Sequence, residues 1–356
     1  MLDFTSALYL GLRHPSRSLQ PWAELTLGRP AALASPPGAR SVAQRFSDLV
    51  GCESGTIVPS TLHLFWDLFD VLASERIAIY MDTCTYAIAK WGVERVAARG
   101  VPVRSFRHHD PTALTYRLEQ DARRNLRPVV LADGLCPACG GPAPVADYLQ
   151  ISRRFGGYLV LDDTQALGIL GYAPGPSAPY GKGGGGSLRW HNLDGPDVLL
   201  GSSLAKGFGV PVAVLTGSKQ MVQRFEENSA TRVHCSPPSI AVIHAAEHAL
   251  AVNDDDGDPL RRRLAQLVRR FRERLRQTGM SASGGWFPVQ TLKPILGNDT
   301  GRLHERLLRL GIRTVMHRAA EGQVPRLSFL ITALHMRSEI DQCVAAVEHA
   351  CALTHL

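Results

Sequence analysis

The sequence predicts an α/β fold, with a mainly parallel sheet covered by helices and a smaller α+β domain after it. Between about residues 45 and 252, short apolar runs alternate with helical patterns, an order typical of parallel sheets. After residue 253 the pattern changes to a long basic helix followed by further strands and helices. We therefore expect an N-terminal arm at 1–44, a large α/β domain at 45–252 and a small C-terminal domain at 253–356.

The elements follow from local patterns along the chain. The first forty residues are rich in Pro, Gly and Ser, which predicts an arm with short turns. Apolar runs predict strands at 76–81, 101–106, 128–132, 158–161, 198–200 and 212–216, with helices at 87–99 and 145–155. The segment 173–190 contains four consecutive glycines and predicts an irregular, mobile surface loop near the site. The run NDDDGDP at 253–259 predicts a break. After it we expect a helix to about 279, a strand at 289–292, a helix at 300–310, a strand at 326–332 and a terminal helix.

Composition narrows the class of protein. The 356 residues are 45% hydrophobic and 20% charged, with a net charge of +7. No apolar run is long enough for a membrane span, and the first residues lack a signal-peptide pattern, so a cytoplasmic location is expected. Arginine-rich runs near 261–263 and 269–274 predict a solvated helix face, and a basic surface would also suit a polyanionic thioester or an acidic carrier protein. Nucleic acid is not an expected partner, because no aromatic residues interleave with these charges.

Seven cysteines, an odd number, predict free thiols in a reducing compartment. Only Cys136 and Cys139 have the spacing of a CxxC pair. No second CxxC or histidine pair at finger spacing supplies the other ligands of a zinc site. We therefore expect two turn cysteines and no metal.

Three candidate sites each follow an apolar strand, where ligands gather in open parallel sheets. Asp162 and Asp163 follow the strand near 158–161, and a carboxylate there could pair with a protonated ring nitrogen, bind Mg²⁺ or cap a helix. Lys206 lies in a small-residue loop, where desolvation would favour the neutral amine that forms a Schiff base. A surface lysine in a glycine turn is the alternative.

The third candidate site is the sequence Ser60-Thr61-Leu62, ahead of an apolar helix. Backbone N–H groups at a helix start could hold a phosphate. Simple N-capping by a hydroxyl side chain explains the same pattern.

The order of these motifs resembles the α-oxoamine synthases, a family of pyridoxal 5'-phosphate (PLP) enzymes of fold type I. The segment DFTSALYLGL at 3–12 is similar to the family's DFxSNDYLGL, and FRHHD at 106–110 to FxHND. Residues 133–144 are similar to DGxFSMDGDxAPL, 162–168 to DEAHSxG, 203–209 to TxSKAxG and 326–335 to RLRIxxxAxH. The resemblance runs almost from end to end.

This resemblance implies roles for matching positions. Lys206 would bind PLP covalently, Asp162 would hold the pyridine nitrogen, and Ser203 would replace the phosphate-binding threonine. Ser60, Thr61 and Leu62 occupy the loop whose backbone helps hold the phosphate. Arg326 is the candidate for a substrate carboxylate. Family members are dimers with shared active sites, so 229–238 could reach the partner's cofactor, with Thr231 and Ser236 as loose candidates.

Departures from the family pattern leave the reaction open. Tyr86 stands where the family has a ring-stacking histidine, and Gln165 stands for the histidine of DEAHS. Tyrosine can stack but is a poor proton carrier near neutral pH, and an amide cannot titrate. The serine and aspartate of FSMDG are Pro137 and Cys139, and the second arginine of RLR is Ser328.

The resemblance and these departures together leave three reactivities open. The leading expectation is condensation of an amino acid with an acyl thioester, carried by coenzyme A or an acyl carrier protein. Transamination, decarboxylation or aldol-type cleavage of an amino acid is the alternative. A PLP-binding partner subunit without turnover is the third.

Overall fold

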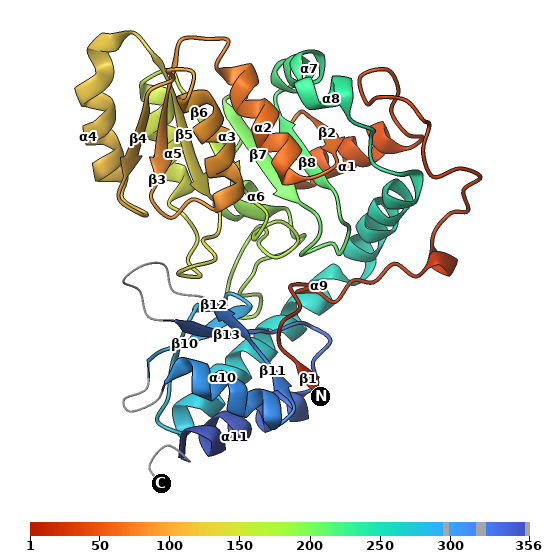
Figure 1. The fold of residues 1–356 in the computed structure, drawn as a ribbon, viewed down its shortest axis with the longest axis vertical. Helices are drawn as coiled ribbons and strands as arrows, with labels where there is room; N and C mark the ends of the chain where they lie inside the picture. The colour runs from red at the N-terminus through yellow and green to blue at the C-terminus, as the bar shows by residue number, and fades with distance from the viewer. Residues whose placement is uncertain (295–298, 318–324, 353–356) are drawn as a thin grey trace.

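A seven-stranded sheet forms the centre of the chain in the computed structural model, which describes residues 1–294, 299–317 and 325–352 (Figure 1). The strand order is β2-β8-β7-β6-β5-β3-β4. The strands are β2 (Ser54–Val58), β8 (Ala213–Gly217), β7 (Val198–Ser203), β6 (Tyr158–Asp162), β5 (Arg127–Asp133), β3 (Ile77–Asp82) and β4 (Val103–Phe106). The strands from β4 to β7 run parallel, whereas β8 and β2 pair antiparallel at one edge. The predicted α/β class with a mainly parallel sheet is confirmed.

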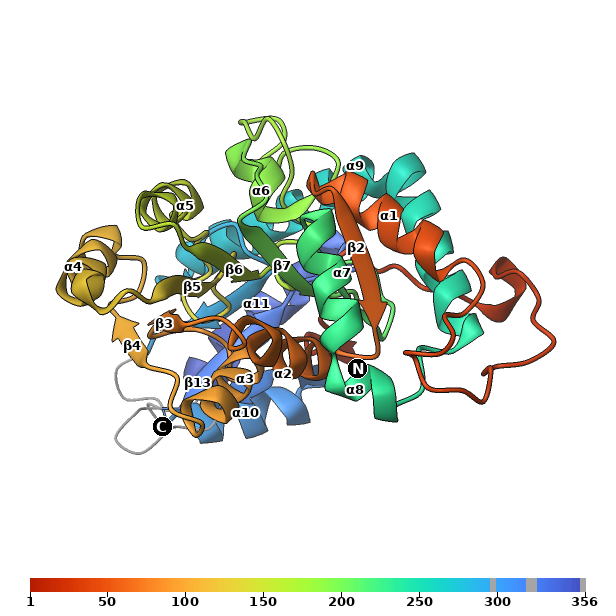
Figure 2. The same ribbon diagram turned by 90° about the horizontal axis from the view of Figure 1, so that it is seen from above.

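Helices cover both faces of this sheet (Figure 2). They are α1 (Ala39–Val50), α2 (Thr61–Leu72), α3 (Ala87–Ala97), α4 (Pro111–Asp121), α5 (Val145–Arg154), α6 (Gly186–His191), α7 (Lys219–Asn228), α8 (Ala230–His234) and α9 (Ile240–Gln277). Because side chains of a strand alternate between faces, Leu159 of β6 packs with the core of α1, α5 and α9, whereas Val160 packs with that of α2, α3 and α7. Strands buried on both faces explain the continuous apolar runs in the sequence.

A second, smaller sheet lies at the C-terminal end, in the order β12-β13-β10-β9 (Figure 1). Its strands are β9 (Ala282–Ser283), β10 (Val289–Leu292), β12 (Val315–His317) and β13 (Arg326–Leu330), and all pair antiparallel. The helices α10 (Thr300–Arg309) and α11 (Arg337–Ala352) accompany it. The start of the chain joins this part, since β1 (Leu2–Asp3) pairs parallel with β11 (Ile312–Arg313).

The expected break at 253–259 is wrong, because α9 continues through it with Pro259 inside the helix. Tertiary contacts stabilise this stretch of polar residues. Asn253 donates its amide to Gly183 O at 3.1 Å, and Asp258 accepts hydrogen bonds from Gly183 N and from buried Arg261. The division into domains at residue 252 therefore stays a prediction, and it falls within a helix.

The segment 173–190 is more ordered than expected. Residues 184–188 are buried, and 186–191 form α6. Gly168 N donates to Gly184 O and Gly186 N donates to Leu170 O, both at 2.8 Å. The expectation of an irregular surface loop is therefore wrong for its second half, because the glycines allow close backbone packing under the site.

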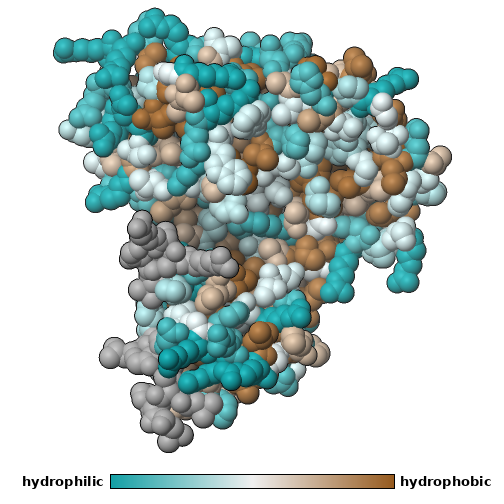
Figure 3. Space-filling view, in the orientation of Figure 1, coloured by the Kyte–Doolittle hydropathy of each residue, from teal (hydrophilic) through white to brown (hydrophobic). Residues whose placement is uncertain are grey.

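Hydrophilic side chains are prominent on the surface, as the share of charged residues predicts. On the face shown in Figure 3, hydrophilic residues crowd the end of the molecule that carries α4. In the described part of the chain, no helix has both the length and the apolar character needed to cross a membrane.

Candidate active site

The carboxyl ends of β5, β6 and β7 bring the candidate residues together. Asp162 ends β6 and pairs in register with Asp133, which ends β5. Ser203 ends β7, and Lys206 follows in the turn toward β8. Neighbouring parallel strands end at the same edge, so residues more than seventy positions apart meet there.

A cavity of about 200 Å³ opens at this edge. Six of the nine predicted site residues line it: Thr61, Tyr86, Asp162, Gln165, Ser203 and Lys206. Asp133 and Pro137 also line it. The structure therefore gathers the predicted carboxylate and lysine around one space.

Burial perturbs both charged groups. Asp162 is buried and accepts a hydrogen bond from Thr164 N at 3.0 Å. Desolvation raises the pKa of its carboxyl, while the Thr164 hydrogen bonds and the Lys206 charge act in the opposite direction. Desolvation lowers the pKa of the Lys206 amine, and the charges of Asp162 and Asp133 oppose this shift. A lysine with a lowered pKa has a larger share of the nucleophilic free amine.

Tyr86 and Gln165 occupy the two positions where histidines were expected from the family. The Lys206 Nζ lies 5.7 Å from the centroid of the Tyr86 ring. Gln165 is buried, and its Oε1 accepts a hydrogen bond from the Tyr9 hydroxyl at 2.8 Å. This bond fixes the amide orientation, so that the Gln165 NH₂ group is the end left for a ligand.

In the segment Ser60-Thr61-Leu62, the Ser60 side chain caps a helix and the next two backbone N–H groups are at the helix start. Ser60 is the N-cap of α2, and its hydroxyl also lies 2.9 Å from His63 Nδ1. The first backbone bond of the helix joins Leu64 N to Ser60 O at 3.1 Å. The amides of Thr61 and Leu62 precede this bond and point out of the helix end. Backbone N–H groups, rather than the Ser60 side chain, are thus available for an anion.

The remaining predicted contacts are not part of this cavity. Arg326 is exposed at the start of β13 and does not line it. Thr231 donates its hydroxyl to Asp67 Oδ2 at 2.5 Å, and Ser236 lines a separate cavity of about 30 Å³. Roles for Arg326, Thr231 and Ser236 stay predictions.

Asp133 lines the cavity but was not among the predicted site residues. Its Oδ1 accepts a hydrogen bond from Tyr86 N at 3.1 Å, and its buried Oδ2 has no partner among the residues that the structure describes. Burial, followed by the charge of Asp162, raises the pKa of this carboxyl. The signal was available, because Asp133 follows an apolar strand just as Asp162 does.

Relatives of known name match most of the chain. The 8-amino-7-oxononanoate synthase of Alkalilimnicola ehrlichii is 26% identical over 317 residues, which cover 87% of this chain and 76% of that protein. The enzyme of the same name from Symbiobacterium thermophilum is 22% identical over 359 residues, covering 97% and 87%. No protein-family model matches the chain.

Solved structures match nearly the whole fold. A serine palmitoyltransferase from Sphingomonas wittichii has a TM-score of 0.84 at 17% identity, over 99% of this chain and 88% of that one. The 8-amino-7-oxononanoate synthase of Francisella tularensis has a TM-score of 0.76 at 16% identity, over 100% and 99%. The chain therefore has the fold of the type I PLP-dependent transferases. The relatives and the structures together support the α-oxoamine synthase family.

Proposed function

We propose that this chain binds PLP through Lys206 and condenses an amino acid with an acyl thioester, as an oxoamine synthase does. One observation carries the proposal: buried Asp162 and the lysine of lowered pKa line the same cavity at the carboxyl edge of the sheet. The relatives named 8-amino-7-oxononanoate synthase and the structures of serine palmitoyltransferase support it. One similar structure, with a TM-score of 0.85, is a serine palmitoyltransferase with a PLP internal aldimine.

The residues around the cavity fit PLP. The volume of about 200 Å³ is more than ten times the roughly 10–15 Å³ that a single water requires. A buried carboxylate normally has a charged or hydrogen-bonded partner, and within the described part of the chain the Asp133 Oδ2 atom has none. Asp162 would hold the ring nitrogen, Tyr86 would cover a ring face, and the amides of Thr61 and Leu62 with Ser203 would hold the phosphate.

When bound, PLP supplies a ring that withdraws electrons from the Cα atom of an attached amino acid. Asp162 would keep the ring nitrogen protonated, because an ionised carboxylate raises the pKa of a neighbouring base. Lys206 would hold the cofactor and afterwards move a proton to and from Cα at its Nζ atom. Gln165, fixed by Tyr9, would donate its NH₂ group to an oxygen of the cofactor.

The acyl donor is the finer part of the proposal. We propose a thioester of coenzyme A or of an acyl carrier protein, both polyanionic, for a chain with a net charge of +7. We further propose that the chain works in the cytoplasm as a homodimer with shared active sites. Sedimentation of the purified protein would test whether it is a dimer. Recovery of activity in a 1:1 mixture of two differently inactivated variants would test the shared site.

A second PLP reaction is favoured by one observation. Tyr86 and Gln165 stand where the family has histidines, and neither side chain carries a proton readily near neutral pH. A reaction whose proton transfers need only Lys206, such as transamination, decarboxylation or aldol-type cleavage, would suit this cavity.

The first test is covalent capture of PLP. The chain has five lysines, so peptide mass spectrometry after borohydride reduction can assign the attachment. We expect the PLP mass at Lys206, and its loss together with the visible absorption band in Lys206→Ala. Lys182→Ala, which changes an exposed lysine, should behave as wild type. Attachment elsewhere, or no band after PLP is added, would refute the proposal.

The second test separates the two reactions. Purified enzyme with PLP is incubated with isotopically labelled amino acids, with and without acyl-CoA or acyl carrier protein thioesters. Products that contain both the labelled Cα and the acyl chain support condensation. Turnover that yields an oxo acid, an amine or a shortened amino acid without the acyl chain supports the second reaction.

A further inference from the structure

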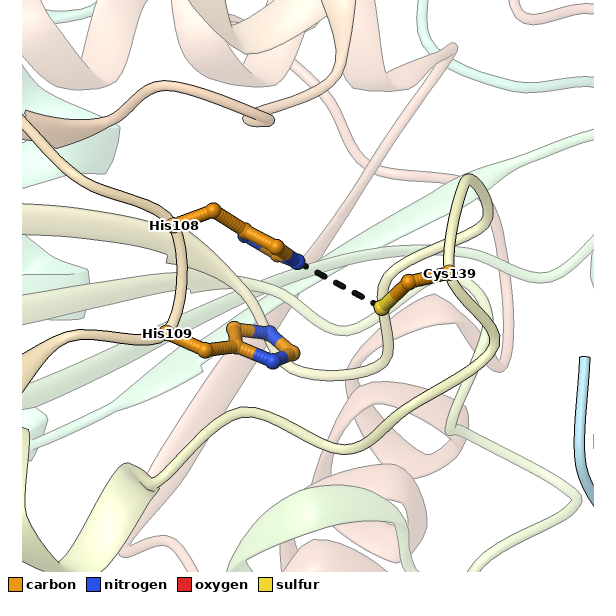
Figure 4. A group of neighbouring side chains, drawn as sticks. All are labelled: His108, His109 and Cys139. Atoms are coloured by element: carbon orange, nitrogen blue, oxygen red, sulfur yellow. Dashed lines mark hydrogen bonds between the residues drawn. The ribbon is translucent and has the colours of Figure 1, made fainter.

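Two histidines and a cysteine from separate loops meet beside the cavity. His108 and His109 lie between β4 and α4, and Cys139 lies between β5 and α5. One ligand atom from each side chain lies within 4.8 Å of the other two. Figure 4 shows both imidazole rings extending toward the Cys139 sulfur. Cys136, the other cysteine of the pair, is buried and lies outside this group.

His108 is held in one orientation by a buried carboxylate. Its Nδ1 lies 2.8 Å from Asp82 Oδ1, which leaves Nε2 3.4 Å from Cys139 Sγ. Asp82 also accepts hydrogen bonds from Cys84 N at 2.8 Å, from His109 N at 3.0 Å and from the Tyr148 hydroxyl at 3.3 Å. A carboxylate that accepts from the outer nitrogen of a metal-binding histidine is a typical supporting contact. Asp82 is therefore a positioning residue rather than a ligand.

His109 shows two features that its neighbours leave unexplained. Its φ of 52° lies in the left-handed region, which residues other than glycine rarely adopt. Its Nε2 atom is buried and has no hydrogen-bond partner in residues 1–294, 299–317 and 325–352. The ring lies 3.7 Å from that of His108, measured between centroids. A buried nitrogen without a partner is costly unless another group occupies the space beside it.

We propose that His108, His109 and Cys139 bind a divalent transition-metal ion, with Zn²⁺ the best match and a fourth position open to water. Zinc bonds to nitrogen and sulfur are about 2.0–2.3 Å long, so neighbouring ligands of a tetrahedral site lie about 3.5 Å apart. The observed 3.4 Å between His108 Nε2 and Cys139 Sγ matches this separation. Imidazole and thiolate donors exclude Mg²⁺ and Ca²⁺ as the preferred ion, because these prefer oxygen.

Such an ion would stabilise one wall of the cavity. Pro137, which lines the cavity, lies in the same loop as Cys139. The metal would link this loop to the His108–His109 loop, which in turn is hydrogen bonded to Asp82 at the end of β3. The site does not depend on PLP, since none of its three ligands lines the cavity.

The test is zinc binding by the tag-free, full-length protein, kept reduced. Protein loaded with Zn²⁺ and desalted should retain one ion per chain by elemental analysis, and Co²⁺ should give a thiolate charge-transfer band. Cys139→Ser and His109→Gln should each weaken zinc binding at least tenfold in competition with a chelator. Asp82→Asn should weaken it by about 10–100-fold, as expected for a supporting contact. Cys84→Ser is the matched control, and its affinity should stay within threefold of wild type.

Three results would overturn the proposal. The first is no retained zinc in the reduced wild type, and the second is wild-type affinity in both Cys139→Ser and His109→Gln. The third is loss of binding in Cys84→Ser with binding kept in Cys139→Ser, because the ion would then lie at the neighbouring group of Asp82, Cys84 and His108. Repeating the titration in Lys206→Ala separates this site from PLP binding, since zinc affinity should be unchanged there.

Discussion

Replacement of Arg261 tests how α9 stabilises the segment that follows Asp162 in the sequence. This side chain is only 2% exposed. Its Nη1 donates to Gly168 O at 2.9 Å and to Asn253 Oδ1 at 2.8 Å. Its Nη2 and Nε donate to Asp258 Oδ1 at 2.7 and 3.1 Å. Gly168 closes the motif that begins at Asp162, so these bonds join the site to the long helix.

The expected loss of stability in an Arg261 variant depends on the polar groups that the substitution leaves without a partner. Removing one member of a buried ion pair typically costs about 3–5 kcal/mol. The Asp258 side chain is 34% exposed, so water can partly solvate its carboxylate once the guanidinium is gone. We therefore expect Arg261→Met, which keeps much of the apolar volume, to lower the free energy of unfolding by about 3 kcal/mol, at the lower end of that range.

Urea unfolding, followed by circular dichroism and by tryptophan fluorescence, measures this loss. With an m value of about 3 kcal/mol per molar, the midpoint should fall by about 1 M. Arg262→Met, at the exposed neighbouring position, should change stability by less than about 0.5 kcal/mol. Equal effects of the two substitutions, or a midpoint shift in Arg261→Met below about 0.2 M, would refute the reasoning.

Three further predictions concern the glycine-rich segment near Arg261 and the cavity. Gly184→Ala should cost about 2 kcal/mol or more, because φ is +73° and the new Cβ would collide with a guanidinium nitrogen. Gly175→Ala, with open space around it, should be nearly neutral by the same urea assay. The pKa of Asp133 is raised from 3.8 by burial, so the folded state keeps a proton that the unfolded state loses. Its stabilisation is complete below about pH 4 and is lost as the pH rises through the raised pKa. Asp133→Asn should therefore flatten this decline in a series of thermal unfolding curves, and an unchanged slope would contradict the assignment. Tyr86→Ala should weaken PLP binding about two- to tenfold, because ring stacking is worth about 0.5–1.5 kcal/mol. Spectroscopic titration against Tyr116→Ala, at a position 60% exposed on α4, would expose an effect unrelated to the cavity.

The sequence was most informative where local and tertiary preferences agree. Strands such as β5 and β6 are buried on both faces, so apolar runs mark them directly. The edge strand β2 was expected ahead of Ser60 but was given no bounds, because Ser54, Gly55 and Thr56 give half of it a turn-like composition. The stretch 253–259 has the composition of a turn, but Asn253 and Asp258 form tertiary hydrogen bonds with Gly183 and bonds with Arg261 that local sequence does not reveal.

The site could be predicted only in part, because some of its features depend on tertiary contacts that local sequence does not show. Asp162 and Lys206 follow strands that the pattern reveals, and both line the cavity. The Ser60 side chain proved to be an N-cap, an alternative that sequence cannot separate from anion binding. The approach of Cys139 to His108 depends on two loops about thirty residues apart. Local sequence carries no signal for such a meeting.

The unbroken course of α9 limits how the two parts of the molecule can move. At about 1.5 Å per residue, its 38 residues form a shaft nearly 60 Å long that leaves the large sheet and ends beside the small one (Figure 1). Because this connection is helical, it cannot act as a flexible hinge. Rotation of the C-terminal elements over the cavity would have to bend α9. We expect the bend at Pro259, because proline lacks the N–H group for one helix hydrogen bond.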